Sequence, residues 1–404
     1  MIMKKLLIQF LEKPTVEAVF LKLVERVSVL MPLKKLIILE SIPILSDNTY
    51  CIYEQLIKRR FNQTYTIIWI YSADDMRINS YIGDLPHNVH IFRYDGAIKS
   101  KLALTRLKTR AKFLISANVP LTKVRNSQKA FYLTHGDAMK DIGDISHYVG
   151  KHIDGVLTSS DWFVDVSAKN FQISPDKIYP LGLPRCDYLF SNEKSLQDLA
   201  DMNHYDKIIA WLPTIRQRIS GKKDVDTIYE SGIPIIESEA ELKELNRYLE
   251  ANKTLLVLKI HFIQDRQFIK INNMSNILLI DNNYLATKGW QLYEFLGHTD
   301  GLITDYSSVY YDYLLCHKPI GLTVDDLDAY ISQHGIIFDD YFDNIKGIYI
   351  NTLDDLKRFI QTVQIGERCS WETNDRTSRY QKYWDYQATD RVMRLLEEEG
   401  LRNE

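Results

Sequence analysis

A turn that carries two hydroxyl groups follows a short apolar run near residue 300. The segment Thr304–Ser308 comes after Gly301–Ile303 and before an aromatic, apolar run, so we expect a strand, a tight turn and a helix. The first backbone N–H groups of a helix lack partners within the helix, and the helix dipole adds positive potential there. Thr304, Ser307 and Ser308 are therefore candidates to bind a phosphate group. Helix capping by Asp305 or Ser307 would leave the same pattern.

Two histidines follow other apolar runs. His135 and Gly136 precede Lys140, and Lys259 stands two residues before His261. An imidazole at the carboxyl end of a strand suits a general base, and glycine allows backbone or substrate to approach closely. A single histidine at such a position is more often structural, so neither motif decides the function by itself.

Arginines follow two further strand-like segments. The turn 182–187 presents Arg185 and Asp187, and the loop after residue 212 contains Arg216, Arg218, Lys222 and Lys223. A salt-bridged turn or a solvated loop would contain the same residue types. Ligands of parallel sheets bind outside the carboxyl ends of the strands, and all five motifs fall at such expected ends. Two imidazoles, several cations and a helix N-terminus together indicate a site for a diphosphate.

Alternating strands and helices are expected to position these motifs. We expect strands at 36–40, 65–71, 113–116, 130–134 and 155–158, and again at 207–212, 254–259, 301–303, 319–322 and 348–350. We expect helices at 48–60, 239–251, 291–297 and 353–363. Such alternation indicates parallel sheets covered on both faces, here in two α/β domains that face one another. We place the domains at 36–200 and 201–370, with a linker at 191–205. Within 371–404, a charged helix over 380–399 is expected to pack back on the first domain.

Residues 1–35 form an amphipathic segment. An apolar stripe runs along an expected helix over 15–31 and consists of Val16, Val19, Phe20, Leu23, Val24, Val27 and Leu30. Lysines flank this helix, and a second basic run at 99–112 is interleaved with leucines. A basic amphipathic helix can lie on an anionic membrane surface. It can equally pack as an ordinary helix on the first domain.

The composition argues against several classes of protein. A net charge of −3 disfavours bulk nucleic-acid binding. The four cysteines are scattered, and no cluster of carboxylates indicates a metal, so we expect no metal and no other cofactor. No apolar run reaches the ~20 residues of a membrane-spanning helix, and no signal-peptide cleavage site is evident. We therefore expect a cytoplasmic protein.

Taken in order, the motifs resemble those of a known family. His135–Lys140, Gly182–Asp187, Pro213–Arg216, Lys259–His261 and Thr304–Ser308 occur in that order, and the last continues into 311–313 and 318–320. From about residue 36 onward the chain is similar to the CDP-glycerol glycerophosphotransferase family, the polyol-phosphate transferases of teichoic-acid synthesis. The resemblance implies a GT-B fold, with two Rossmann-like domains for acceptor (36–200) and donor (201–370). It also implies CDP-glycerol or CDP-ribitol as donor, an undecaprenyl-linked saccharide acceptor, and a peripheral position at the cytoplasmic face of the cell membrane.

The resemblance also suggests a role for each candidate residue. We expect His135 to take the acceptor's proton and His261, with Lys259, to hold the diphosphate. Arg216 would neutralise developing charge, while Thr304, Ser307 and Ser308 would bind the donor phosphates. Supporting roles are expected for Gly136, Lys140, Arg185, Asp187 and Asp305.

Four positions depart from the family pattern. The proline expected after the second histidine is Phe262, and the expected Arg-Gly, Pro-Gly and Asp-Gly pairs appear as His334-Gly335, Lys346-Gly347 and Asp385-Tyr386. These changes leave the donor polyol open. The alternatives are a GT-B glycosyltransferase that uses a nucleotide sugar, and a non-catalytic membrane-bound partner in envelope assembly. The length of 404 residues favours single additions over polymerisation in teichoic-acid or capsule synthesis, and a homo-oligomer stays open.

Overall fold

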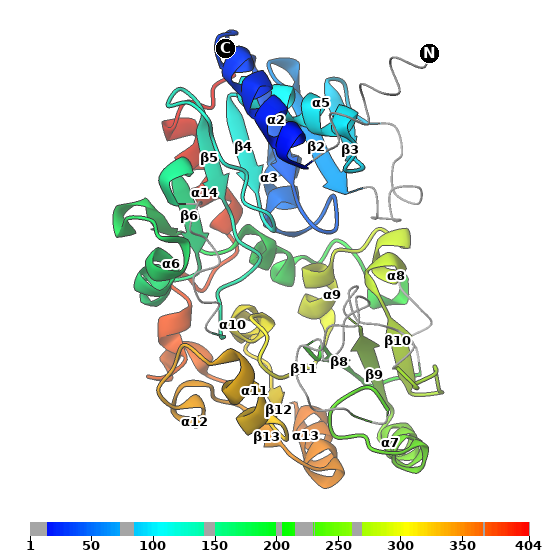
Figure 1. Ribbon diagram of the computed structural model, residues 1–404. Helices are drawn as coiled ribbons and strands as arrows, with labels where there is room; N and C mark the ends of the chain where they lie inside the picture. The colour runs from blue at the N-terminus through cyan, green and yellow to red at the C-terminus, as the bar shows by residue number, and fades with distance from the viewer. Residues whose placement is uncertain are drawn as a thin grey trace.

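The computed structural model contains two fully parallel β-sheets (Figure 1). It describes residues 14–72, 85–140, 150–198, 204–214, 229, 231–260, 269–366 and 368–403. The first sheet has the strand order β3-β2-β1-β4-β5-β6-β7, and the second has the order β10-β9-β8-β11-β12-β13. This architecture confirms the predicted pair of Rossmann-like α/β domains.

The elements have the following bounds. The first sheet contains β1 (Leu36–Glu40), β2 (Thr66–Ser72), β3 (Val89–Tyr94), β4 (Phe113–Ser116), β5 (Lys129–Tyr132), β6 (Gly155–Thr158) and β7 (Ile178–Pro180). The second contains β8 (Lys207–Trp211), β9 (Thr254–Lys259), β10 (Ile277–Ile280), β11 (Gly301–Thr304), β12 (Ile320–Thr323) and β13 (Ile348–Ile350). The helices are α2 (Pro14–Val29), α3 (Asp47–Lys58), α5 (Ile98–Arg110), α6 (Val164–Phe171), α7 (Glu239–Ala251), α8 (Asn282–Thr287), α9 (Leu292–His298), α10 (Val309–Tyr313), α11 (Leu327–His334), α12 (Tyr341–Asn344), α13 (Leu353–Ile365) and α14 (Ala388–Glu398).

Continuous apolar runs build the central strands. Every residue of β1 and of β9 is buried, as expected for parallel strands covered by helices on both faces. α7 and α13 each begin with a capping box, at Ser238 and at Thr352, which satisfies backbone donors of the first turn. The apolar runs and the capping boxes are strong local signals. They explain why β1, β9, α7 and α13 match the sequence predictions closely.

The structure corrects the prediction at the sheet edges and near the C-terminus. β3, β7 and β10 are absent from the predicted strands, and each lies at an edge of its sheet. An edge strand has only one neighbour, and in β3 only Val89 is buried; β10 is apolar at all four positions, so its apolar pattern alone does not explain why it was missed. α14 begins at Ala388 rather than near Tyr380, because residues 378–380 form a separate 3-10 turn.

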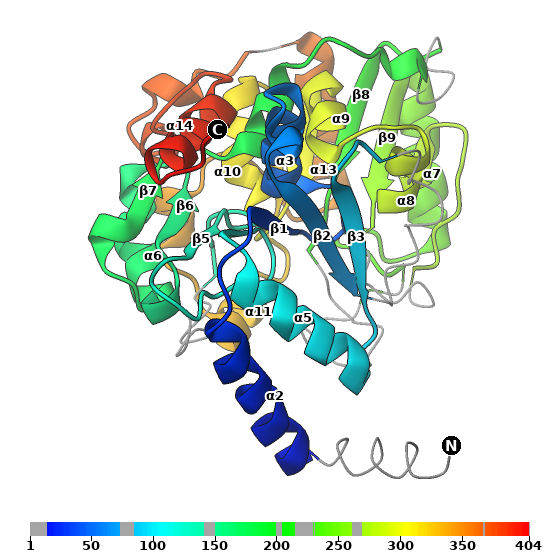
Figure 2. The same cartoon turned by 90° about the horizontal axis from the view of Figure 1, so that it is seen from above.

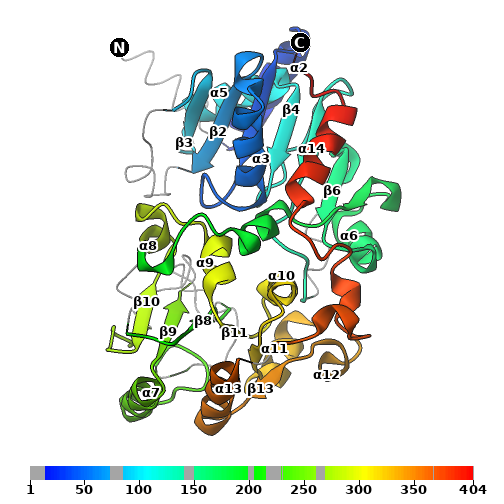
Figure 3. The same cartoon turned by 180° about the vertical axis from the view of Figure 1, so that it is seen from behind.

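α14 lies beside α3 on one face of the first sheet (Figure 3). Arg59 of α3 forms ion pairs with Asp390 (2.6 Å) and Glu397 (2.9 Å) of α14. The Asp187 carboxylate accepts hydrogen bonds from the N–H groups of Ala388 (3.0 Å) and Thr389 (2.8 Å). Asp187 therefore caps α14 and stabilises the packing of this helix on the first domain.

The molecule has two halves, each built around one of the two sheets. Aromatic side chains join these halves on one side. The ring of Tyr311 in α10 lies 4.9 Å from that of Phe163 and 5.0 Å from that of Tyr380. Trp162 and Phe338 approach to 5.4 Å between ring centroids. Because these residues come from both halves, the apolar core continues across the boundary between the sheets.

Candidate active site

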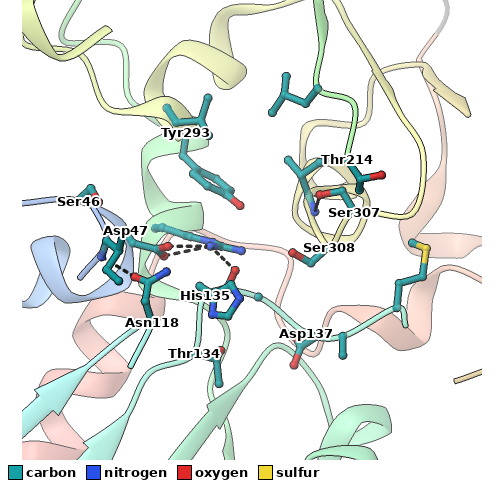
Figure 4. A pocket seen from close by; sticks show the side chains of 18 of the residues that line it. Ser46, Asp47, Asn118, Thr134, His135, Asp137, Thr214, Tyr293, Ser307 and Ser308 are labelled. Carbon is teal, nitrogen blue, oxygen red and sulfur yellow. Dashed lines mark hydrogen bonds and ion pairs between the residues drawn. The ribbon is translucent and has the colours of Figure 1, made fainter. Parts of the chain in front are cut away.

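A cleft of about 660 Å³ lies between the two sheets. Loops after β1, β4 and β5 line one side, and loops after β8 and β11 line the other (Figure 4). The predicted site residues that line it are His135, Gly136, Lys140, Arg185, Lys259, Ser307 and Ser308. The structure thus brings together motifs that are far apart in the sequence. His261, Phe262 and Arg216 lie outside the described residues.

His135 is exposed to the cleft just after β5. Its Nδ1 lies 3.5 Å from the Tyr132 hydroxyl. Loss of water around the ring against the cleft wall disfavours the charged form and lowers the pKa of His135 below its ordinary value of 6.5; the Asp47 carboxylate opposes this effect, and the Arg185 guanidinium adds to it. The imidazole is therefore neutral at physiological pH, which is the state that can accept a proton.

Buried hydrogen bonds hold the loop that carries His135. Thr134 has a φ of +54°, a value that β-branched residues rarely adopt. The buried Asn48 side chain donates to the carbonyl oxygens of Leu133 (3.0 Å) and Thr134 (2.9 Å), and its oxygen accepts the N–H of Arg185 (2.9 Å). These three bonds offset the backbone strain and direct the loop toward the cleft.

Gly136 brings the two halves of the molecule into contact. Its φ is +125°, and an added Cβ would lie 2.4 Å from the Ser308 hydroxyl oxygen and 2.7 Å from Nη2 of Arg185. Both the backbone conformation and the space therefore require glycine. As a result, the loop of His135 and the serine turn form opposite walls of the same narrow region (Figure 4).

Ser307 and Ser308 lie in the cleft at the start of α10. Behind them, the fully buried Asp305 carboxylate accepts hydrogen bonds from the Thr214 N–H (2.9 Å) and hydroxyl (2.8 Å) and from the Tyr306 N–H (2.7 Å). Asp305 therefore ties the loop after β8 to the loop after β11. These hydrogen bonds stabilise the serine turn, but Asp305 itself does not line the cleft.

Thr304 does not occupy the position that the sequence suggested. It is the last residue of β11, it is fully buried, and it does not line the cleft. Its hydroxyl donates to the Leu212 carbonyl oxygen at 2.9 Å. The hydroxyl thus bonds the backbone just after β8 and stabilises the sheet, so it is not available in the cleft.

Arg185 is a buried cation that both halves share. Its Nη1 lies 3.0 Å from Oδ1 of Asp47 and 2.7 Å from the His135 carbonyl oxygen, and its Nη2 lies 2.8 Å from Oδ2 of Asp312. The guanidinium also covers the Tyr293 ring at 4.6 Å. Arg185 thus connects α3, the loop of His135 and α10 at the boundary between the sheets.

Several cleft residues were missed in the sequence. Asp47 and Asn118 come shortly after β1 and β4, so the strand-end signal that identified His135 would also have found them. Tyr293 lies inside α9 and has no such signal. His334, one of the positions that depart from the family pattern, lines the cleft next to Tyr330, with their ring centroids 4.8 Å apart.

Lysines complete the polar lining of the cleft. Lys259 is nearly buried at the end of β9, and Lys140 is exposed beyond the loop of His135. Both are placed to meet an anionic ligand. Within the described ranges, no group of three His, Cys, Asp or Glu side chains is arranged to hold a metal ion.

Comparisons with known proteins agree with this geometry. Residues 23–398 match the family model described as CDP-Glycerol:Poly(glycerophosphate) glycerophosphotransferase. The chain is 23% identical over 382 residues to the teichoic acid ribitol-phosphate polymerase TarL of Staphylococcus aureus, with 88% of this chain and 61% of TarL covered. It is 24% identical over 406 residues to the teichoic acid glycerol-phosphate transferase of the same organism, with 91% and 94% covered.

Solved structures show the same fold. The wall teichoic acid polymerase TagF superposes with a TM-score of 0.71 at 18% identity, covering 98% of this chain and 96% of that one. The chain spans 32–61% of the length of the first five curated relatives that it matches. Because the family model covers nearly the whole chain, this protein belongs to the CDP-Glycerol:Poly(glycerophosphate) glycerophosphotransferase family.

Proposed function

We propose that the protein transfers glycerol phosphate, or the related ribitol phosphate, from a CDP-activated donor to a lipid-linked acceptor and releases CMP. The close approach of Gly136 to Ser308 carries this proposal, because it places an imidazole and a serine turn on opposite walls of one cleft. Family membership and the names of the similar proteins support a product of the teichoic-acid type.

His135 acts as the general base in the proposed reaction. Its neutral imidazole takes the proton of the acceptor hydroxyl, whose oxygen attacks the donor phosphorus that carries the polyol. A new O–P bond forms, the bond between this phosphorus and the CMP oxygen breaks, and CMP leaves with the electron pair. Such a transfer depends on positioning and charge stabilisation more than on covalent help.

Ser307, Ser308 and Lys259 bind the donor phosphates. The two hydroxyls and the lysine ammonium line the same cleft as His135, and charge-assisted hydrogen bonds to phosphate are the stronger kind. His261 is proposed to hold the diphosphate and Arg216 to neutralise the developing charge. The CDP-polyol is a substrate, and we assign no step to a metal or another cofactor.

Release of CMP tests the proposed reaction. The full chain is incubated with a lipid-linked acceptor in detergent and with CDP-glycerol, CDP-ribitol or a UDP-sugar. We expect CMP from one CDP-polyol and a fall of about 10²–10⁴-fold in kcat for His135→Ala. His90→Ala, on the edge strand β3, is the matched control and should retain activity. Full activity of His135→Ala, or turnover of the UDP-sugar alone, would contradict the proposal.

We further propose that α2 and α5 form a surface that meets anionic lipid at the cytoplasmic face of the membrane. α2 packs beside α5 (Figure 2), and Arg125 holds its C-terminal end by donating to the carbonyl oxygens of Val29 (3.0 Å) and Met31 (2.8 Å). The apolar stripe of α2 divides into two faces. Val16, Phe20 and Val24 are half-buried, whereas Val19, Leu23, Val27 and Leu30 are exposed.

Basic residues surround the exposed apolar face of α2. Lys22, Arg26 and Lys34 are exposed near it, and α5 has no acidic residue. An apolar stripe bordered by basic side chains suits an anionic bilayer surface. Among the described helices, none is long and apolar enough to cross a bilayer.

Vesicle sedimentation tests this surface. Leu23→Glu with Val27→Glu should lower binding to phosphatidylglycerol vesicles by roughly 10-fold or more, since each buried aliphatic side chain contributes about 1.5–3 kcal/mol. Ile365→Glu changes a residue that is 80% exposed at the end of α13 and should leave binding intact. Equal binding of the double variant and the wild type would refute the proposed surface.

A further inference from the structure

A buried carboxylate bridges the two central strands of the first sheet. Glu40 is the last residue of β1, which pairs with β4 at the point where the strand order reverses. The residue is 5% exposed. Oε2 accepts hydrogen bonds from three consecutive backbone N–H groups, those of Ala117 (3.3 Å), Asn118 (3.1 Å) and Val119 (3.0 Å). Glu40 therefore holds the loop 117–119, which follows β4.

The loop 117–119 is linked to the imidazole of His135 through the Tyr132 hydroxyl. The backbone of Ala117 also acts on the ring, because it raises the histidine pKa and so favours the protonated imidazole. The Tyr132 hydroxyl lies 3.4 Å from the Asn118 carbonyl oxygen and 3.5 Å from Nδ1 of His135. The partner of one ring nitrogen decides which nitrogen carries the proton. The loop thus bears on both the orientation and the tautomer of the ring.

We propose that Glu40 is a positioning residue that acts through the loop 117–119 to hold His135 in the orientation and tautomer needed to accept a proton. This inference rests on the proposed role of His135 as the base. Three N–H groups that converge on one oxygen need a strong acceptor, which a carboxylate supplies. An apolar side chain at position 40 would remove this acceptor from the N–H groups of Asn118 and Val119, whereas the Ala117 N–H would keep its bond to the carbonyl oxygen of residue 40 at 3.1 Å.

The charge state of Glu40 is compatible with this role. Burial raises its pKa to about 7, the three backbone hydrogen bonds oppose that rise, and the nearby Asp47 carboxylate adds to it. Oε1 is buried and has no hydrogen-bond partner among the described residues. A glutamine can keep an oxygen toward the three N–H groups, so Glu40→Gln should preserve most of the loop. Glu40→Leu removes the acceptor entirely.

Two measurements on the full chain test the inference. In the CMP-release assay, Glu40→Leu should lower kcat by about 10²-fold with little change in donor KM, because a misplacement near 1 Å costs about that factor. Glu40→Gln should recover most of the activity. Asp154→Leu is the matched control: Asp154 accepts the Ala130 N–H at 2.9 Å near the opposite end of the same sheet, and its loss should leave kcat unchanged.

Nitrogen-15 NMR of histidine-labelled protein provides the second readout, which needs no turnover. The chain has 10 histidines, so the His135 signals are assigned by their absence in His135→Ala. One tautomer should dominate in the wild type and in Glu40→Gln, whereas Glu40→Leu should show a mixture. An unchanged tautomer and kcat in Glu40→Leu would overturn the inference. Full activity of His135→Ala would instead refute the proposed base, while the NMR result would still report on the link between Glu40 and the ring.

Discussion

Replacing Gly136 with alanine tests the contact on which the proposed active site depends. An added Cβ would lie 2.4 Å from the Ser308 Oγ and 2.8 Å from the Ser308 Cβ, whereas Cβ atoms essentially never come closer than 3.0 Å to other atoms. The φ of +125° adds backbone strain for any residue with a side chain. The substitution must therefore move the loop of His135 or push the two walls of the cleft apart.

The expected cost has two parts. Strain at a positive φ costs about 1–3 kcal/mol, and an extra methyl in a packed region typically costs about 1–3 kcal/mol. Gly96→Ala is a matched control, because Gly96 also has a positive φ (+74°) and an added Cβ would meet nothing within 4 Å. The control carries the backbone strain of its own, smaller positive φ and no steric contact. Gly136→Ala should thus be less stable than Gly96→Ala by about 1–3 kcal/mol.

Urea unfolding and CMP release measure the two consequences. The free energy of unfolding reports the cost of the contact, and kcat reports the displacement of His135 from the serine turn. A shift of about 1 Å between reacting groups lowers the rate by about 10²-fold. If Gly136→Ala matches Gly96→Ala in both stability and kcat, the close approach of Gly136 to Ser308 does not exist in the active enzyme, and the reasoning fails.

Three further predictions concern buried or titrating groups. Arg185→Met leaves the Asp47 and Asp312 carboxylates without their shared cation and should lower the free energy of unfolding in urea by about 3–5 kcal/mol. Because the pKa of His135 is lowered, kcat should be constant above the ordinary value of 6.5 and fall only at lower pH; a fall that begins above pH 6.5 would contradict this. Burial raises the pKa of Glu40 from 4.5 to about 7, so its contribution to stability is full below pH 4.5 and is lost as the pH rises through 7. Relative to Glu40→Gln, the wild type should lose about 3 kcal/mol between these limits, at about 1.4 kcal/mol per pKa unit, as measured by urea unfolding at pH 4.5 and pH 8.

The sequence predicted the elements in which local and long-range signals agree. β1 and β9 are buried throughout and each has a neighbour on both sides, and α13 carries both a capping box and an apolar face. The edge strands β3 and β7 escaped prediction because half-exposed residues interrupt their apolar pattern. Tertiary pairing with a single neighbour, which a local pattern does not contain, decides that these segments are strands.

In the candidate site, too, local patterns predicted some residues, whereas tertiary contacts decided others. The strand-end rule directed attention to His135 and Ser308, and both line the cleft between the loops at the carboxyl ends of the two sheets. It could not distinguish a residue that faces the cleft from one that faces a neighbouring strand, and so it included Thr304. Tyr293 was missed because its contacts with Arg185 and Asp312 depend on how α9 meets the other half of the molecule.

In each sheet, a carboxylate joins the ends of the two neighbouring strands at which the strand order reverses. Glu40 joins the end of β1 to the loop after β4, and Asp305 joins the loop after β11 to Thr214 after β8. In both sheets, the carboxylate accepts backbone N–H groups at the point where the strand order reverses, which is where ligands of such folds bind. Glu40 supports the wall that carries His135, and Asp305 supports the wall that carries the serine turn.

The two walls of the cleft are linked through Arg185. This guanidinium donates to the His135 carbonyl oxygen on one side and to Asp312 of α10 on the other, directly beside the contact between Gly136 and Ser308. A change in the angle between the halves would have to break these buried charge-assisted bonds, which are among the costliest to lose. The distance from His135 to the serine turn is therefore set by the fold, so the proposed base and the proposed phosphate-binding turn are held in place by contacts within the chain.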